Sequence, residues 1–194
     1  MADVSEQIVR EYFETHGFYI WQPCKYQVAA RKKRDDEEID LIITNPRVKD
    51  QKLPGRLIWV SSDLARVRQA VVGIRAWHTD KFTPAVLETS PEIFRFAQPE
   101  VLRKTDAILK DAPVAKILCL SGLSSNRQMR GEIIEILRKN GIDGVLTFKN
   151  MLLELMAYVK ASHGYEKSDL LQTLRILKNY NLLKTAQLEL FDKK

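Results

Sequence analysis

The segment Glu37-Glu38-Ile39-Asp40-Leu41-Ile42-Ile43-Thr44 carries the strongest signal of how this chain folds. It is short, apolar and closed by Asn45-Pro46, which is typical of a β-strand that ends at a turn. An aspartate inside such a segment is costly to bury unless it is paired, hydrogen-bonded or bound to a metal. Two interpretations of Asp40 follow: it accepts hydrogen bonds from turn amides at the start of the strand, or it belongs to a functional site.

A second apolar segment, Ala70 to Trp77, is the clearest buried strand of the chain. The other predicted elements, from hydrophobic periodicity and turn residues, are a helix over Asp3–Thr15, strands over Phe18–Gln22 and Lys25–Arg31, a possible strand over Leu57–Val60 with a helical turn at Ser61–Asp63, a helix over Pro99–Lys110, a strand over Val114–Leu120, a helix over Asn126–Lys139, a strand over Gly144–Phe148, a helix from near Asn150, and a last helix over Asp169–Tyr180. This order predicts an α/β domain over residues 1–160, with a mixed sheet and helices on both faces, followed by a helical C-terminal extension over residues 161–194.

Composition narrows the class of protein. The 194 residues include 31 Lys and Arg against 25 Asp and Glu, a net charge of +6, which excludes an acidic disordered chain and weakly favours an anionic partner. Two cysteines exclude a disulfide scaffold and an all-cysteine zinc site. Because no apolar run reaches about 18 residues and the N-terminus is polar and acidic, we expect a cytosolic globular protein without a membrane span or signal peptide.

Several common catalytic patterns are missing from the sequence. The Gly-containing segment Ser121–Ser125 lacks the Gly-Lys-Ser/Thr ending of a phosphate-binding loop, and no Gly-x-Ser-x-Gly motif is present. The three histidines are far apart and none has the spacing of paired zinc ligands. Chemistry therefore has to be sought around Asp40.

A helix, a hairpin with a strand aspartate, and a strand that ends in a basic residue followed by Ala-Trp resemble the PD-(D/E)xK superfamily of restriction-endonuclease-like and Holliday-junction-resolvase-like nucleases. The resemblance covers about residues 3–150 and implies a restriction-endonuclease-like fold. The aspartate of the family motif falls on Asp40, its glutamate on Gly73 and its lysine on Arg75.

What the resemblance implies about activity depends on Gly73. The family binds Mg²⁺ through its two acids, and the ion polarises the phosphate that is cut. Gly73 brings no carboxylate, and Arg75 keeps a positive charge that can hold a phosphate but effectively never loses its proton. We therefore expect a nuclease-like protein that binds nucleic acid, with DNA as the expected form, and whose catalytic motif is degraded, so that it needs no cofactor.

Two alternatives stay open. In the first, the chain is a Mg²⁺-dependent DNA endonuclease in which Asp40 binds the metal with a carboxylate that has moved to another position; the candidates are Glu38, Glu11, Glu6 and Glu88. In the second, the fold is a non-enzymatic scaffold. The leucines of the Asp169–Tyr180 helix would then pack on the body, on another protein or on a second copy of the chain, and intramolecular packing is the simpler expectation.

Basic and aromatic residues supply candidate nucleic-acid contacts. The candidates are the run Arg31-Lys32-Lys33-Arg34 together with Arg66, Arg68, Arg127 and Arg130. The run either grips a phosphate backbone or forms a solvated turn that the following acids neutralise. Cations in the first turn of a helix oppose its dipole, so Arg127 and Arg130 suggest an external anion or are plain surface residues. For Trp59 and Trp77, packing in the core is favoured over base stacking.

Overall fold

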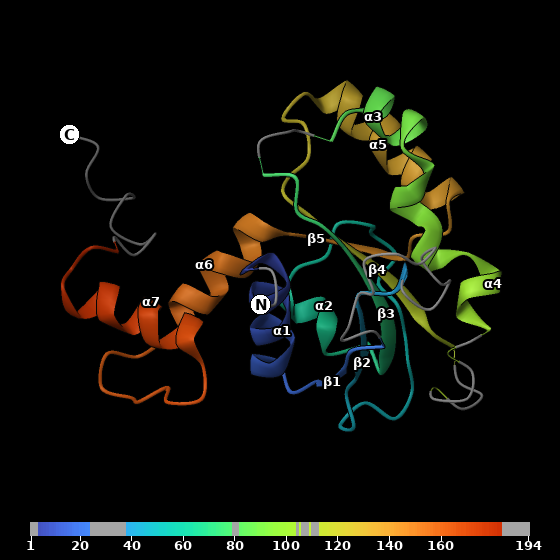
Figure 1. Cartoon of the computed structure of the whole chain (residues 1–194). Coiled ribbons are helices and arrows are strands. Elements are labelled where there is room, and N and C mark those ends of the chain that lie inside the picture. The colour runs from blue at the N-terminus through green and yellow to red at the C-terminus, as the bar shows by residue number, and fades with distance from the viewer. Residues whose placement is uncertain are drawn as a thin grey trace, which may run out of the picture.

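A five-stranded mixed sheet forms the centre of the molecule in the computed structural model (Figure 1), which describes residues 4–23, 38–78, 82–103, 105, 109 and 113–183. The strands lie in chain order: β1 (Tyr19–Trp21), β2 (Leu41–Thr44), β3 (Gln69–Arg75), β4 (Ala115–Leu120) and β5 (Gly144–Thr147). β1, β2 and β3 pair antiparallel, whereas β3, β4 and β5 pair parallel. The predicted α/β class and mixed sheet are confirmed.

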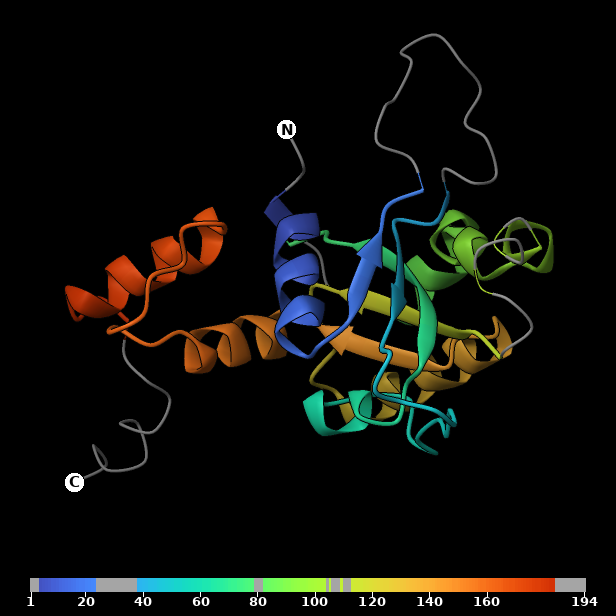
Figure 2. The same ribbon diagram turned by 90° about the horizontal axis from the view of Figure 1, so that it is seen from below.

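One face of the sheet is covered by helices from the two ends of the described chain and by one short helix between β2 and β3. These are α1 (Val4–Thr15), α2 (Ser61–Leu64) and α6 (Phe148–Tyr158), and they share a core with alternate residues of the strands, among them Leu41 and Ile43. The last helix, α7 (Asp169–Asn179), lies at the far end of α6, away from the sheet (Figures 1 and 2). Its Leu171 and Leu174 are buried in the same core, which confirms intramolecular packing of the leucine face.

The opposite face carries a second core under the helices that follow β3 and β4. These are α3 (Pro84–Thr89), the 3₁₀ helix η2 (Pro91–Ala97), α4 (Pro99–Leu102) and α5 (Arg127–Lys139). Ile42 and Val71 contribute to this core from the sheet. Because side chains alternate between the faces of a strand, β2 and β3 supply both cores at once.

Polar side chains set the starts of the helices in the second half of the chain. The side chains of Asn126, Thr147 and Ser168 accept hydrogen bonds from backbone N–H groups in the first turns of α5, α6 and α7. Such caps satisfy donors that a helix leaves unpaired at its start. Thr147 therefore begins α6 at Phe148, two residues before the predicted start near Asn150.

Two of the predicted elements differ from the structure. Leu57–Val60 forms no strand; Ile58 makes a single parallel bridge to Val145 of β5. The predicted helix over Pro99–Lys110 ends as α4 at Leu102, where Thr105 closes a turn onto the Leu102 carbonyl. The predicted strand over Lys25–Arg31 lies outside the described residues. Among the described helices, none combines the length and apolar character that crossing a membrane requires.

The packing of Trp59 holds the segment Leu57–Val60 beside β5. Its indole is fully buried, and its Nε1–H donates to the Arg56 carbonyl at 2.9 Å. A Cβ at Gly144 would lie 2.4 Å from the Trp59 ring, so the close packing of the ring against β5 requires a glycine there. The prediction that Trp59 belongs to the core is confirmed.

Two glycine substitutions should have opposite effects on stability. Gly144→Ala should lower the free energy of unfolding by about 1–3 kcal/mol, because the added methyl group overlaps the Trp59 ring. Gly131→Ala, within α5 and with open space around its Cβ, should raise it by about 0.5–1 kcal/mol through helix propensity. Urea unfolding measures both, and an unchanged midpoint for Gly144→Ala would contradict the packing described.

Candidate functional site

The antiparallel pairing of β2 and β3 brings the predicted site residues together. Leu41 lies opposite Val72, and the N–H of Asp40 donates to the Val72 carbonyl at 3.2 Å. Asp40 therefore sits where β2 begins and β3 continues towards Arg75. Since β3 and β4 run parallel, this edge of the sheet also holds the carboxyl end of β4, with Arg75 opposite Leu120.

The Asp40 carboxylate is held by two donors of β3. Its Oδ2 accepts from the backbone N–H of Ile74 at 2.7 Å and from Nη1 of Arg75 at 3.0 Å. The Arg75 side chain is 13% exposed and that of Asp40 32%. A charged acceptor with two donors at such distances makes strong hydrogen bonds. Both of these donors belong to the neighbouring strand β3 and not to a turn.

Arg75 is also fixed by η2. Its Nη1 donates to the Ile74 carbonyl at 2.9 Å, and its guanidinium carbon lies 5.9 Å from the centre of the Phe96 ring. Nη2 is 3.5 Å from the carbonyl oxygen of Glu92. The guanidinium therefore lies between the aspartate and an aromatic ring, an arrangement that suits the planar, weakly hydrated cation of arginine.

Gly73, where the resemblance puts the second acid, is packed against the same ring. A Cβ built at Gly73 would lie 2.5 Å from Cδ1 of Phe96, and Phe96 is fully buried. Any side chain at position 73 thus requires Phe96 to move. The space that a glutamate would need in the family motif is occupied by an aromatic ring.

The four proposed positions for a moved carboxylate lie in different surroundings. Glu38 is buried and its Oε1 is 3.6 Å from Nη1 of Arg95 in η2. Glu6 accepts a hydrogen bond from the Gln22 side chain. Glu11 bonds to Ser168, the capping residue of α7, and partial burial raises the pKa of its carboxyl. Glu88 is exposed on α3. Of the four, only Glu38 is within two residues of Asp40 in the chain and faces a residue of η2.

Mg²⁺, which the resemblance implies, does not fit the described donors. The described residues include no group of three or more His, Cys, Asp or Glu side chains that could hold a metal ion. Oδ2 of Asp40 already faces the fixed charge of Arg75, and the ring of Phe96 fills the place of the second acid. Mg²⁺ requires near-octahedral oxygen ligands, so a guanidinium beside the one aligned carboxylate opposes it.

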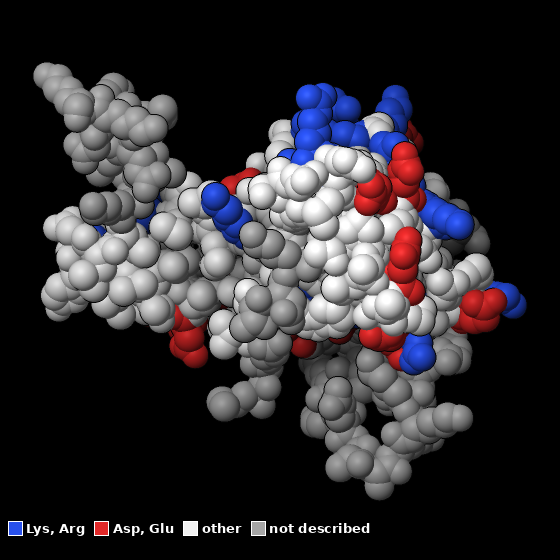
Figure 3. Space-filling view, turned by 90° about the horizontal axis from the view of Figure 1, so that it is seen from above, with Lys and Arg blue, Asp and Glu red and all other residues white. Residues whose placement is uncertain are grey.

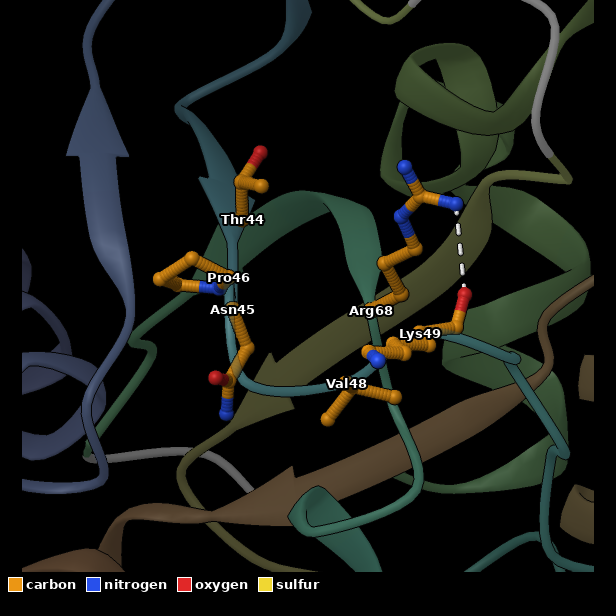
Figure 4. Close-up of a pocket in the computed structure, with 6 residues that line it drawn as sticks. All are labelled: Thr44, Asn45, Pro46, Val48, Lys49 and Arg68. Atoms are coloured by element: carbon orange, nitrogen blue, oxygen red, sulfur yellow. Dashed lines mark hydrogen bonds between the residues drawn. The ribbon is translucent and has the colours of Figure 1, made fainter.

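The candidate basic residues lie at opposite ends of the strands, some before β3 begins and others beyond the end of β4. Arg68 precedes β3 and lines a pocket of about 420 Å³ at the edge opposite Arg75 (Figure 4). Arg66 is exposed two residues earlier in the chain. Arg127 and Arg130 are exposed in the first turn of α5, and Figure 3 shows Lys and Arg side chains gathered on the α5 side of the molecule. Residues 31–34 lie outside the described residues.

Cys119 and His78 each have contacts that tie them into the fold. Cys119 is fully buried in β4, and burial raises the pKa of its thiol, so it is unsuited to act as a nucleophile and packs as a small apolar residue. Nε2 of His78 is 3.2 Å from the hydroxyl of buried Ser5, and its ring contacts Phe148 edge to face. The contacts of His78 join the segment after β3 to α1 and α6.

Sequence reasoning missed the contribution of η2 to this site. Phe96 and Arg95 contact Gly73, Arg75 and Glu38 from a segment for which no secondary structure was predicted. The available signal was the pair of aromatic residues Phe94 and Phe96, which follow the apolar strand that contains Gly73. It shows that the segment is buried, but not which strand residue it covers.

Comparisons of the chain with models of protein families, with curated proteins and with solved structures gave no match. The site is therefore interpreted from its own geometry.

A double-mutant cycle tests the Asp40–Arg75 pair. Asp40→Ala should lower the free energy of unfolding by about 2–3 kcal/mol, because it leaves the Ile74 N–H and a mostly buried guanidinium without this acceptor. Arg75→Ala in the Asp40→Ala background should cost less than in the wild type, giving a coupling energy of about 1–2 kcal/mol. Additive losses in chemical unfolding would mean that the pair contributes nothing.

Proposed function

We propose that this chain is a nucleic-acid-binding protein of restriction-endonuclease-like architecture that binds without cutting. The observation that carries the proposal is the Asp40–Arg75 pair across β2 and β3, with Phe96 beside Gly73. The order of α1, the antiparallel β1–β2–β3 strands and the parallel β4 agrees with the elements on which the resemblance rests.

The absence of cleavage follows from the charges at the site. Hydrolysis of a phosphodiester in this superfamily depends on an ion held by two acids. Here the aligned aspartate is neutralised by an arginine that keeps its proton. Arg75 and the Ile74 N–H both bind Oδ2 and stabilise the aspartate in the folded state, so a metal ion at Asp40 would lie beside the positive charge of Arg75.

Binding of nucleic acid is supported by charge. The chain carries a net charge of +6, and exposed arginines lie at both edges of the sheet. Contacts between such cations and phosphates release counterions, so affinity should fall steeply as salt is added. DNA is the expected form, as for the nucleases that the site resembles.

A protein-interaction function has one observation in its favour. The exposed residues Tyr158, Ile176, Tyr180 and Leu182 lie on α6, on α7 and just beyond it, away from the sheet. Exposed aromatic and aliphatic side chains in one region are typical of protein-binding surfaces. In this second candidate function the chain is a scaffold subunit, and light scattering of the purified protein as a function of concentration would detect a dimer.

Binding and cleavage assays test the proposal together. The purified protein should shift single-stranded, duplex or branched DNA at low salt, with log Kd rising linearly with log salt concentration. No DNA should be cut in Mg²⁺ or Mn²⁺. Cleavage that Asp40→Ala abolishes would support the moved-carboxylate alternative, and the same assay on Glu38→Gln and Glu88→Gln would identify the second acid.

Rebuilding the motif tests the alignment with the superfamily. The triple variant Gly73→Glu, Arg75→Lys, Phe96→Ala should bind Mn²⁺ by calorimetry, because it supplies the second acid and the space that this acid needs. Phe96→Ala alone should bind none. If the triple variant is folded by circular dichroism and still binds no Mn²⁺, the alignment of β3 with the family motif is wrong.

A further inference from the structure

Two large aromatic side chains are exposed on the edge strand of the sheet. Tyr19 is 73% exposed and Trp21 44%, whereas Ile20 between them packs against the core under α1. Because side chains alternate along a strand, both rings project from the other face of β1. Two exposed rings on one strand do not contribute the stability that burying them would give.

These rings adjoin a basic pocket. In the register of β1 and β2, Tyr19 lies opposite Thr44 and Trp21 opposite Ile42. Thr44 lines the pocket of about 420 Å³ together with Lys49 and Arg68. In Figure 4 the side chains of Thr44 and Arg68 extend in the same direction along the pocket, and Nη1 of Arg68 donates to the Lys49 carbonyl at 3.2 Å.

The residues around this pocket include several basic side chains that are not paired with a described acid. Exposed basic side chains are found at Arg47, Lys49, Lys52, Arg66 and Arg68. None of the five has a carboxylate within 4.0 Å among the residues that the structure describes. Between residues 45 and 68 the acids are Asp50 and Asp63, and Asp63 is paired with Arg56 at 2.7 Å. The local charge therefore favours an anionic partner.

We infer that the exposed face of β1 and the adjoining pocket form a binding platform for a single-stranded nucleic acid, with Tyr19 and Trp21 stacking on bases and Lys49 and Arg68 contacting phosphates. The inference rests on the proposed function and specifies its ligand and its surface. A row of aromatic rings beside cations is the arrangement by which proteins bind single strands without reading sequence. A duplex hides the faces of its bases, so the rings select an unpaired strand.

The spacing of the rings suits this ligand. Alternate residues of a strand lie about 6.6–6.8 Å apart, which is twice the roughly 3.4 Å rise per nucleotide of a stacked strand. One base can therefore lie between the two rings. Thr44 is four residues along β2 from Asp40, about 13 Å at the rise of a strand, so the platform extends away from the Asp40–Arg75 pair.

Fluorescence anisotropy with labelled oligothymidylate, and with the same strand in a duplex with oligoadenylate, tests the platform on the full chain. Tyr19→Ala and Trp21→Ala should each weaken binding of the single strand by between about 5- and 150-fold, with a smaller effect on the duplex. Tyr19→Phe and Trp21→Phe should keep most of the affinity because they keep a ring. Tyr180→Ala is the matched control, since Tyr180 is 74% exposed but lies at the end of α7.

The contribution of Lys49 and Arg68 is measured separately, through the salt dependence of binding. Lys49→Ala with Arg68→Ala should weaken binding of the single strand and reduce the slope of log affinity against log salt by about 1.4. Thermal melting monitored by circular dichroism should show that these exposed substitutions leave the fold intact.

Each outcome separates this inference from the proposal on which it rests. Wild-type affinity in Tyr19→Ala and Trp21→Ala, or an equal loss for single strand and duplex, would overturn the platform while leaving nucleic-acid binding in place. If the wild-type chain binds neither form at low salt, the proposed function fails as well. Loss of single-strand binding in both ring variants, with Tyr180→Ala unchanged, is the expected result.

Discussion

The carboxylate of Asp40 extends the hydrogen bonding between β2 and β3 beyond the first residue of β2. Its Oδ2 takes the N–H of Ile74, and the same atom pairs with Arg75. This contact stabilises the register of the two strands near the edge of the sheet, and a shift of one residue would turn every side chain of β2 to the wrong face. The same register sets Asp40 beside Arg75, on the strand that carries Gly73 under Phe96.

Much of the fold could be read from local patterns. Asn126 and Ser168 mark helix starts that the structure confirms, and the apolar segments around Asp40 and Val72 are neighbouring strands. Local signals suffice there because caps and alternation act over a few residues. The pairing of Asp40 with Arg75 was within reach only through a resemblance, since periodicity alone does not specify which strands are neighbours.

The other features of the site depend on contacts between residues that are far apart in the sequence. The sequence does not show that Phe96 covers Gly73, or that Arg95 faces Glu38, because η2 is placed by tertiary packing. The same holds for the basic candidates: Arg68 and Arg75 are close in the chain but lie at opposite ends of β3, on different edges of the sheet. Closeness in the sequence therefore does not show that the two arginines belong to separate surfaces.

The packing of Phe96 on Gly73 has a consequence for evolution. On the proposed function, a mutation that returns an acid to position 73 first meets a buried ring, so it damages the fold before it can improve any chemistry. A smaller residue at position 96 would have to arise first, and it opens a cavity without any immediate benefit. Each single change lowers the stability of the fold, so the glycine–phenylalanine pair can be replaced without loss only when both positions change together.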